Sequence, residues 1–166
     1  MQRFFLQPNR AYRDFQLVYG LLALNFLIPA TTYLLDPVGT HERLLGLCAL
    51  VGEDGWPSSE SSHLWRFLGI SDVYVLGFLC VWLMLDLRLH IAALPGLALL
   101  KALTSLQFLW GFAFGSGHRL FLGIGLFDGL TTALFLGFAL RAWRALPTAN
   151  EGLVPRPIGW LKRPTT

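Results

Sequence analysis

The chain has 166 residues, of which 54% are hydrophobic and only 14% are charged, and its mean hydropathy is +0.54. A soluble domain carries about 25% charged residues, so this composition excludes an ordinary soluble globular domain. The sequence pI of about 9.2 does not indicate nucleic-acid binding, because the basic residues gather near the two termini instead of forming a soluble patch, and we expect no nucleic-acid partner.

Four segments are apolar and long enough to cross a bilayer, which takes roughly 20 residues for about 30 Å of hydrocarbon. In chain order they are residues 14–35, 64–85, 89–114 and 120–142. The first follows a basic N-terminal segment, residues 1–13, and contains Pro29, where we expect a kink. Its apolar run, roughly 22 residues, exceeds the h-region of a signal peptide and no A-x-A site follows, so we interpret it as an uncleaved span.

The segments that join these spans differ in length. Between the first and second spans lies a long loop whose middle, HERLLGLCALVG, could form a short interfacial helix, while GEDGWPSSESS is typical of turns. The other two connections, residues 86–88 and 116–119, are short and force the spans beside them to be antiparallel. We therefore predict an all-α, four-helix transmembrane bundle over residues 14–144. A proline-rich basic tail follows at residues 145–166.

Basic residues are unevenly distributed between the two ends of the predicted spans. One end carries Arg3, Arg10, Arg13, Arg88, Arg141, Arg144, Arg156, Lys162 and Arg163. The other carries Arg43, Arg66 and Arg119 together with the acidic residues Glu42, Glu53, Asp54 and Glu60. Because cytoplasmic loops of membrane proteins carry the excess of Lys and Arg, we expect both termini in the cytoplasm and the long loop outside, in a bacterial inner membrane.

Ionisable residues inside the predicted spans are the candidates for a functional site. Asp72 lies about 15 residues before the turn near residue 87 and Lys101 about 14 after it, so at about 1.5 Å per residue their depths agree within about 3 Å. By the same measure Asp128 is out of register with Lys101 by about 8 Å. We therefore expect Asp72 and Lys101 to pair, with Asn25 nearby. Asp128 is placed nearer the outside, with Thr131, Thr132 and Gln107 as companions.

Such a pair has two interpretations. A single Lys or Asp at the centre of a membrane helix costs roughly 2.5–3.5 kcal/mol, and intramembrane ionisable residues often mark a functional site. The pair could therefore belong to a proton relay, to a headgroup or quinone site, or to a contact with a partner subunit. The interpretation that the sequence favours is a buried ion pair that sets the register of the helices.

Other chemistry has little support in the sequence. His63 and His118 fall at the starts of the second and fourth spans, but haem ligands in bundles usually come from helix interiors, so we do not predict haem. Cys48 and Cys80 are far apart and form no CxxC pair. Neither a Glu-x-x-His metal spacing nor a nucleophile–base order is present, so we predict no metal site, no catalytic residue and no bound cofactor, with lipid or quinone left possible.

The fourth span has a stripe of small residues at every fourth position, namely Gly125, Gly129, Ala133 and Gly137. Small residues let another helix backbone approach closely, so that van der Waals contact drives association. The stripe predicts tight helix packing, either within the bundle or against another protein.

Three stretches of the second to fourth spans are distinctive, WRFLGISDVYVLGF, DLRLH and GIGLFDGLTTALFLGFALRAW, and together they cover roughly residues 63–144. In these stretches the chain resembles the DoxX-like group of small bacterial membrane proteins. The resemblance implies a four-helix membrane bundle, and some relatives are associated with quinone-linked oxidoreductase complexes. A weaker resemblance links RDFQLVYGLLALNFLIPATTYLLD to the sterol-isomerase and sigma-2-receptor group. That group relies on a His in the first span, where this chain has Asn25 and Phe26.

Three functions follow from these observations. The first is a noncatalytic accessory subunit that packs against a larger membrane complex, with membrane lipids and other membrane subunits as its partners. The second is a lipid- or quinone-binding membrane protein, which could be an enzyme, with a polar site inside the bundle at Asp72 and Lys101. The third is a small proton-coupled carrier.

Overall fold

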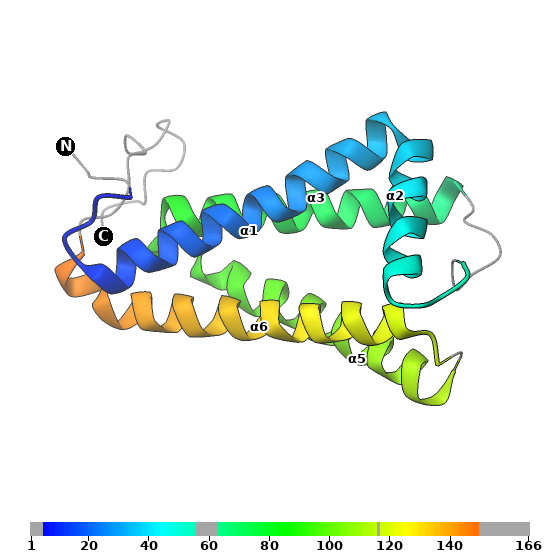
Figure 1. Cartoon of the computed structure of the whole chain (residues 1–166). Helices are drawn as coiled ribbons and strands as arrows, with labels where there is room; N and C mark the ends of the chain where they lie inside the picture. Colours follow the sequence, from blue (N-terminus) through cyan, green and yellow to red (C-terminus); the bar gives the residue numbers. More distant parts are fainter. Residues whose placement is uncertain (1–4, 56–62, 116, 150–166) are drawn as a thin grey trace.

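The computed structural model describes residues 5–55, 63–115 and 117–149, with the backbone alone described for residues 63–68. Throughout these residues the regular structure is helical (Figure 1). The elements are α1 (Arg10–Leu35), α2 (Pro37–Leu50), α3 (His63–Leu85), α4 (Leu87–His90), the 3₁₀ turn η1 (Ile91–Ala93), α5 (Leu94–Phe114), α6 (Arg119–Ala145) and the 3₁₀ turn η2 (Leu146–Thr148).

Three helical segments of the described chain are long and apolar enough to cross a membrane. They are Arg10–Leu35, Leu87–Phe114 and Arg119–Thr148, the second being formed by α4, η1 and α5 in succession. In α3, the residues whose side chains are described make up a shorter apolar helical segment, Gly69–Leu85. These helices confirm the predicted all-helical class and indicate an integral membrane protein.

Local capping explains where the first two helices begin and end. The Asn9 side chain accepts a hydrogen bond from the Tyr12 N–H, so α1 begins at Arg10, ahead of the predicted position 14, and it continues through Pro29. Asp36 ends α1 and caps α2, because its Oδ1 accepts from the Gly39 N–H at 2.9 Å and Pro37 occupies the first turn. The predicted short helix in the long loop is therefore confirmed as part of α2.

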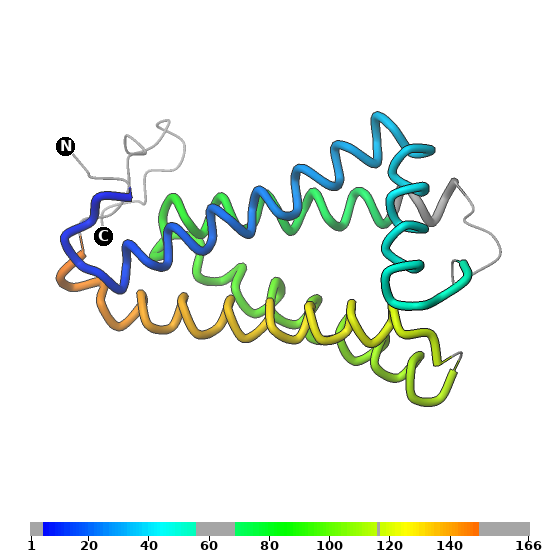
Figure 2. The backbone as a smooth tube through the Cα atoms, in the orientation of Figure 1, coloured from blue at the N-terminus to red at the C-terminus, as the bar shows by residue number. Residues whose placement is uncertain are grey.

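The long helices pack as two antiparallel pairs. α1 packs along α3, α5 packs along α6, and α1 and α6 join the two pairs, whereas α3 and α5 contact each other little. Figure 1 shows the pairs as two layers that lie close together near the start of α1 and the end of α6 and separate toward the opposite end. There α2 runs across from the end of α1 toward the start of α6 (Figure 2).

An aromatic core joins the layers near the start of α1. Tyr12, Phe15 and Tyr19 are fully buried, and the Tyr19 ring lies 4.4 Å from that of Phe15 and 5.5 Å from that of Phe135 on α6. The Tyr19 hydroxyl donates to the Phe135 carbonyl at 2.9 Å. This bond satisfies the buried hydroxyl and ties α1 to α6.

Candidate functional site

Among the described residues, the membrane-spanning helices contain one close ion pair in which both side chains are buried. Lys101 Nζ on α5 donates a hydrogen bond to Asp128 Oδ1 on α6 at 2.6 Å. The two residues are 9% and 3% exposed. Charge-assisted hydrogen bonds of this kind are shorter and stronger than neutral ones, so each group offsets much of the cost of burying the other.

Aromatic and hydroxyl groups surround this pair. Lys101 Nζ lies 5.0 Å from the ring centroid of Phe26 on α1, a cation–π arrangement that places a third helix against the ammonium. One turn along α5, the buried Ser105 hydroxyl donates to the Gly125 carbonyl at 2.7 Å. The Thr132 hydroxyl donates to the Asp128 carbonyl at 2.9 Å. The site is thus built from α1, α5 and α6.

The predicted pairing of Asp72 with Lys101 is wrong. Asp72 lies on α3, which packs along α1 and hardly contacts α5, and its side chain is exposed. Matching positions along the helix axes predicted this pair, but two groups at the same depth can pair only if their helices are neighbours. A shared lipid or quinone site formed by Asp72 and Lys101 therefore has no geometric basis.

Asp128 pairs with Lys101 although the two residues lie at different depths along their helices. Gly125 lies against Leu109 and Gly129 against Ser105, so residue numbers across the α5–α6 contact add to 234. Lys101 is then level with position 133, five residues from Asp128, which is about 7.5 Å at about 1.5 Å per residue. The flexible four-carbon stem of lysine spans this offset.

Asn25 is also misplaced by the sequence argument. It is exposed, whereas the next residue, Phe26, is buried and contacts the ion pair. Successive residues of a helix point about 100° apart, so depth alone could not show that Asn25 lies on the outer face of α1. Gln107 is exposed as well and does not join Asp128.

The small-residue stripe of α6 divides into two halves. A Cβ atom added at Gly125 would lie 2.8 Å from Leu109 Cγ, and one at Gly129 would lie 3.1 Å from Ser105 Oγ, so this half lets α5 pack closely. Ala133 and Gly137 are exposed, and a Cβ added at Gly137 would have no neighbour within 4 Å. Packing within the bundle thus accounts for the first half of the stripe and leaves the second half uncovered.

A second polar cluster holds the segment after α2 against the start of α6. Glu53 Oε1 accepts from the Arg119 N–H at 2.9 Å, and Arg119 Nη1 donates to the Val51 carbonyl at 3.1 Å. His118 Nε2 lies 2.9 Å from the Gly55 carbonyl oxygen and 3.9 Å from the Glu53 carboxylate. Sequence reasoning missed this cluster, because its members lie in two segments that no periodicity connects. The other histidine of the haem hypothesis, His63, has no described side chain.

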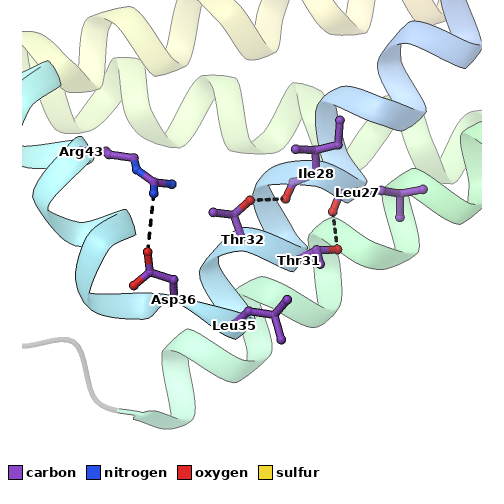
Figure 3. A pocket seen from close by; sticks show the side chains of 7 residues that line it. All are labelled: Leu27, Ile28, Thr31, Thr32, Leu35, Asp36 and Arg43. Carbon is purple, nitrogen blue, oxygen red and sulfur yellow. Dashed lines mark hydrogen bonds and ion pairs between the residues drawn. The ribbon is translucent and has the colours of Figure 1, made fainter.

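A cavity of about 500 Å³ lies between the last turns of α1 and the start of α2 (Figure 3). Leu27, Ile28 and Leu35 supply its apolar lining. The polar residues around it are Thr31, Thr32, Asp36 and Arg43.

Among the described residues the fold forms no metal-binding cluster and no cysteine pair. The part of the chain that the structure describes contains no group of three or more His, Cys, Asp or Glu side chains placed to hold a metal ion. Cys48 and Cys80 are both free thiols and both buried. Comparison of the chain with protein-family models, with curated proteins and with solved structures finds no match. The site must therefore be interpreted from its own chemistry.

Proposed function

We propose that this chain is a noncatalytic membrane protein of four spans that packs, as an accessory subunit, against a larger membrane complex. The observation that carries the proposal is an exposed apolar seam on α6. The seam consists of Leu126, Leu130, Ala133, Gly137 and Leu140, all of them exposed in the isolated chain.

The spacing of the seam suits a helical partner. Its positions follow one another by four, three, four and three residues, the repeat with which side chains of one helix fit between those of another. Leucine on a lipid-facing surface is unremarkable, since lipid chains are as apolar as leucine. Ala133 and Gly137 in the middle of the seam are the informative residues, because small side chains permit close backbone approach.

The Lys101–Asp128 pair supports a structural role for the interior polar groups. Each charge already has its partner within the chain, and Phe26 packs on the ammonium. Removing one partner of a buried pair is far more costly than removing both. The pair therefore suits a role in setting the register of α5 on α6, a role that the sequence had suggested for a different pair, Asp72 with Lys101.

The proposed topology has α3 as the fourth span, with both termini in the cytoplasm. Its support is the clustering of basic side chains at one end of the bundle. There Arg141 lies 3.7 Å from Asp14, and Arg88 Nη2 donates to the Leu146 carbonyl at 2.9 Å. A membrane-impermeant maleimide should label Asp54→Cys in intact cells, and it should label Arg144→Cys only after the membrane is opened; the reverse pattern would overturn the orientation. The bacterial inner membrane and the DoxX-like resemblance stay predictions.

The experiment that tests the accessory role is purification of the tagged full chain from its native membrane in mild detergent, followed by mass spectrometry. The chain should arrive with other membrane proteins in constant ratio. Gly137→Leu should lower that recovery several-fold. Gly96→Leu is the matched control, because both glycines are exposed helical positions at which an added Cβ meets nothing within 4 Å.

Two results would overturn the proposal. One is a chain that purifies alone at every detergent concentration tested. The other is an equal loss of partners in Gly137→Leu and Gly96→Leu, which would place the contact away from the seam.

A further inference from the structure

The cavity between α1 and α2 has an apolar part and a polar part. Leu27 and Ile28 line it one turn before the two threonines, and Leu35 lines it near the end of α1. The Thr31 hydroxyl donates to the Leu27 carbonyl at 2.7 Å, and the Thr32 hydroxyl donates to the Ile28 carbonyl at 2.8 Å (Figure 3). The Thr31 oxygen also lies 2.9 Å from the Tyr74 hydroxyl on α3, so the Thr32 oxygen is the more open acceptor for a further bond.

Two opposite charges stand at the end of the cavity where α1 gives way to α2. Arg43 Nη2 lies 3.5 Å from Asp36 Oδ2, and both side chains are more than half exposed. The other carboxylate oxygen, Oδ1, caps α2 at the Gly39 N–H. This contact is too exposed to contribute much to stability, since surface ion pairs are worth about 0–1 kcal/mol.

From its position at the end of the apolar helix α1, we place the cavity at the depth where a membrane changes from hydrocarbon to headgroups. From Leu27 to Asp36 is nine residues, or about 14 Å along a helix at about 1.5 Å per residue. Asp36 is the first residue beyond the apolar helix α1. The end of the cavity at Leu27 and Ile28 should therefore face acyl chains, while the end at Asp36 and Arg43 should face the headgroup layer. The cavity, of about 500 Å³, is an open groove on the helix surface and not an enclosed pocket.

From this arrangement we propose that the cavity binds one zwitterionic phospholipid whose headgroup carries a primary ammonium, phosphatidylethanolamine being the representative. The lipid phosphate sits against the Arg43 guanidinium, whose planar fork matches phosphate geometry. The ammonium sits against Asp36 Oδ2, which accepts its hydrogen bonds. One acyl chain lies along Leu27 and Ile28.

Charge complementarity selects this headgroup over others. Asp36 and Arg43 together carry no net charge, so a headgroup that also holds one positive and one negative group pairs both. An anionic lipid such as phosphatidylglycerol satisfies Arg43 but leaves the Asp36 carboxylate without an added partner. Phosphatidylcholine brings a positive group that has no N–H to donate. The proposed lipid site lies on α1 and α2 and is separate from the docking seam of α6.

The test is native mass spectrometry of the purified, delipidated full chain titrated in turn with phosphatidylethanolamine, phosphatidylglycerol and phosphatidylcholine. We expect one phosphatidylethanolamine to be retained about tenfold more tightly than the other two, the scale of one hydrogen bond to a charged group. Free phosphoethanolamine should not compete, because it lacks the acyl chain. Equal retention of all three lipids, or full competition by phosphoethanolamine, would overturn the proposal.

Variants separate this site from lipid bound anywhere on the apolar surface. Ile28→Trp fills the cavity and should abolish the retained lipid, whereas Leu99→Trp should not, although both residues are 59% exposed. Asp36→Asn keeps a good helix cap, so its fold is preserved. It should shift the preference from phosphatidylethanolamine to phosphatidylglycerol. An unchanged preference in Asp36→Asn, or equal losses in the two tryptophan variants, would contradict the assignment.

Discussion

Lys101 on α5 and Asp128 on α6 are joined by a 2.6 Å hydrogen bond, and Phe26 of α1 lies on the ammonium of the pair. An ammonium inside a membrane helix costs several kcal/mol by itself. The pairing explains how a segment as apolar as α5 tolerates a lysine near its middle. It also limits how far α5 can slide along α6, because a slide that increases the offset between the two residues would exceed the reach of the lysine stem.

The first prediction separates the observed partner of Lys101 from the one at matching depth. Asp128→Asn should lower the free energy of unfolding by about 3–5 kcal/mol, because it leaves a buried ammonium without its counter-charge. Asp72→Asn, at an exposed position, should change it by less than about 0.5 kcal/mol. Denaturant titration in detergent, followed by helical circular dichroism, measures both. A larger loss in Asp72→Asn would favour the depth-based pairing.

The second prediction concerns the two halves of the α6 stripe. Gly125→Ala should destabilise the bundle by about 1–3 kcal/mol through overpacking, because the new methyl group meets the side chain and the backbone nitrogen of Leu109. Gly137→Ala meets no atom within 4 Å. It should be neutral or stabilising by up to about 1 kcal/mol, the helix-propensity difference between Ala and Gly. Equal effects in the same unfolding assay would mean that α5 does not pack on the first half.

The third prediction concerns the cluster that holds the segment after α2 to α6. Glu53→Ala removes the acceptor of the Arg119 N–H, so amide exchange at the start of α6 and in the segment 51–55 should accelerate about tenfold. Asp54→Ala is the neighbouring control, since Asp54 is exposed and should leave exchange unchanged. Hydrogen-exchange mass spectrometry resolves these peptides. Acceleration in both variants alike would show that the Glu53 contact does not hold the two segments together.

The positions of the apolar helices were predictable because length and hydropathy are properties of a contiguous segment. The predicted spans 89–114 and 120–142 correspond to the apolar segments Leu87–Phe114 and Arg119–Thr148. Their boundaries moved for local reasons. Asp86, for example, caps α4 through the Leu89 N–H, which converts the expected turn into a short helix.

The partners across helices were less predictable, because they depend on which helices are neighbours. Residue spacing placed Asp72 and Lys101 at one depth, but it does not show which helices lie side by side in the bundle. The position of Asn25 failed for a related reason, since depth does not specify the face of a helix. The small-residue stripe did indicate close packing at Gly125 and Gly129. Its division into a covered and an exposed half required the structure.

The most direct test of the structural role given to the Lys101–Asp128 pair is a double-mutant cycle with Lys101→Leu, Asp128→Leu and the double variant. Each single change should lower the free energy of unfolding by about 3–5 kcal/mol, and the double variant should recover most of that loss, because apolar groups replace a buried pair at little cost. Additive losses in the double variant would contradict this account, and would mean that Lys101 and Asp128 act separately.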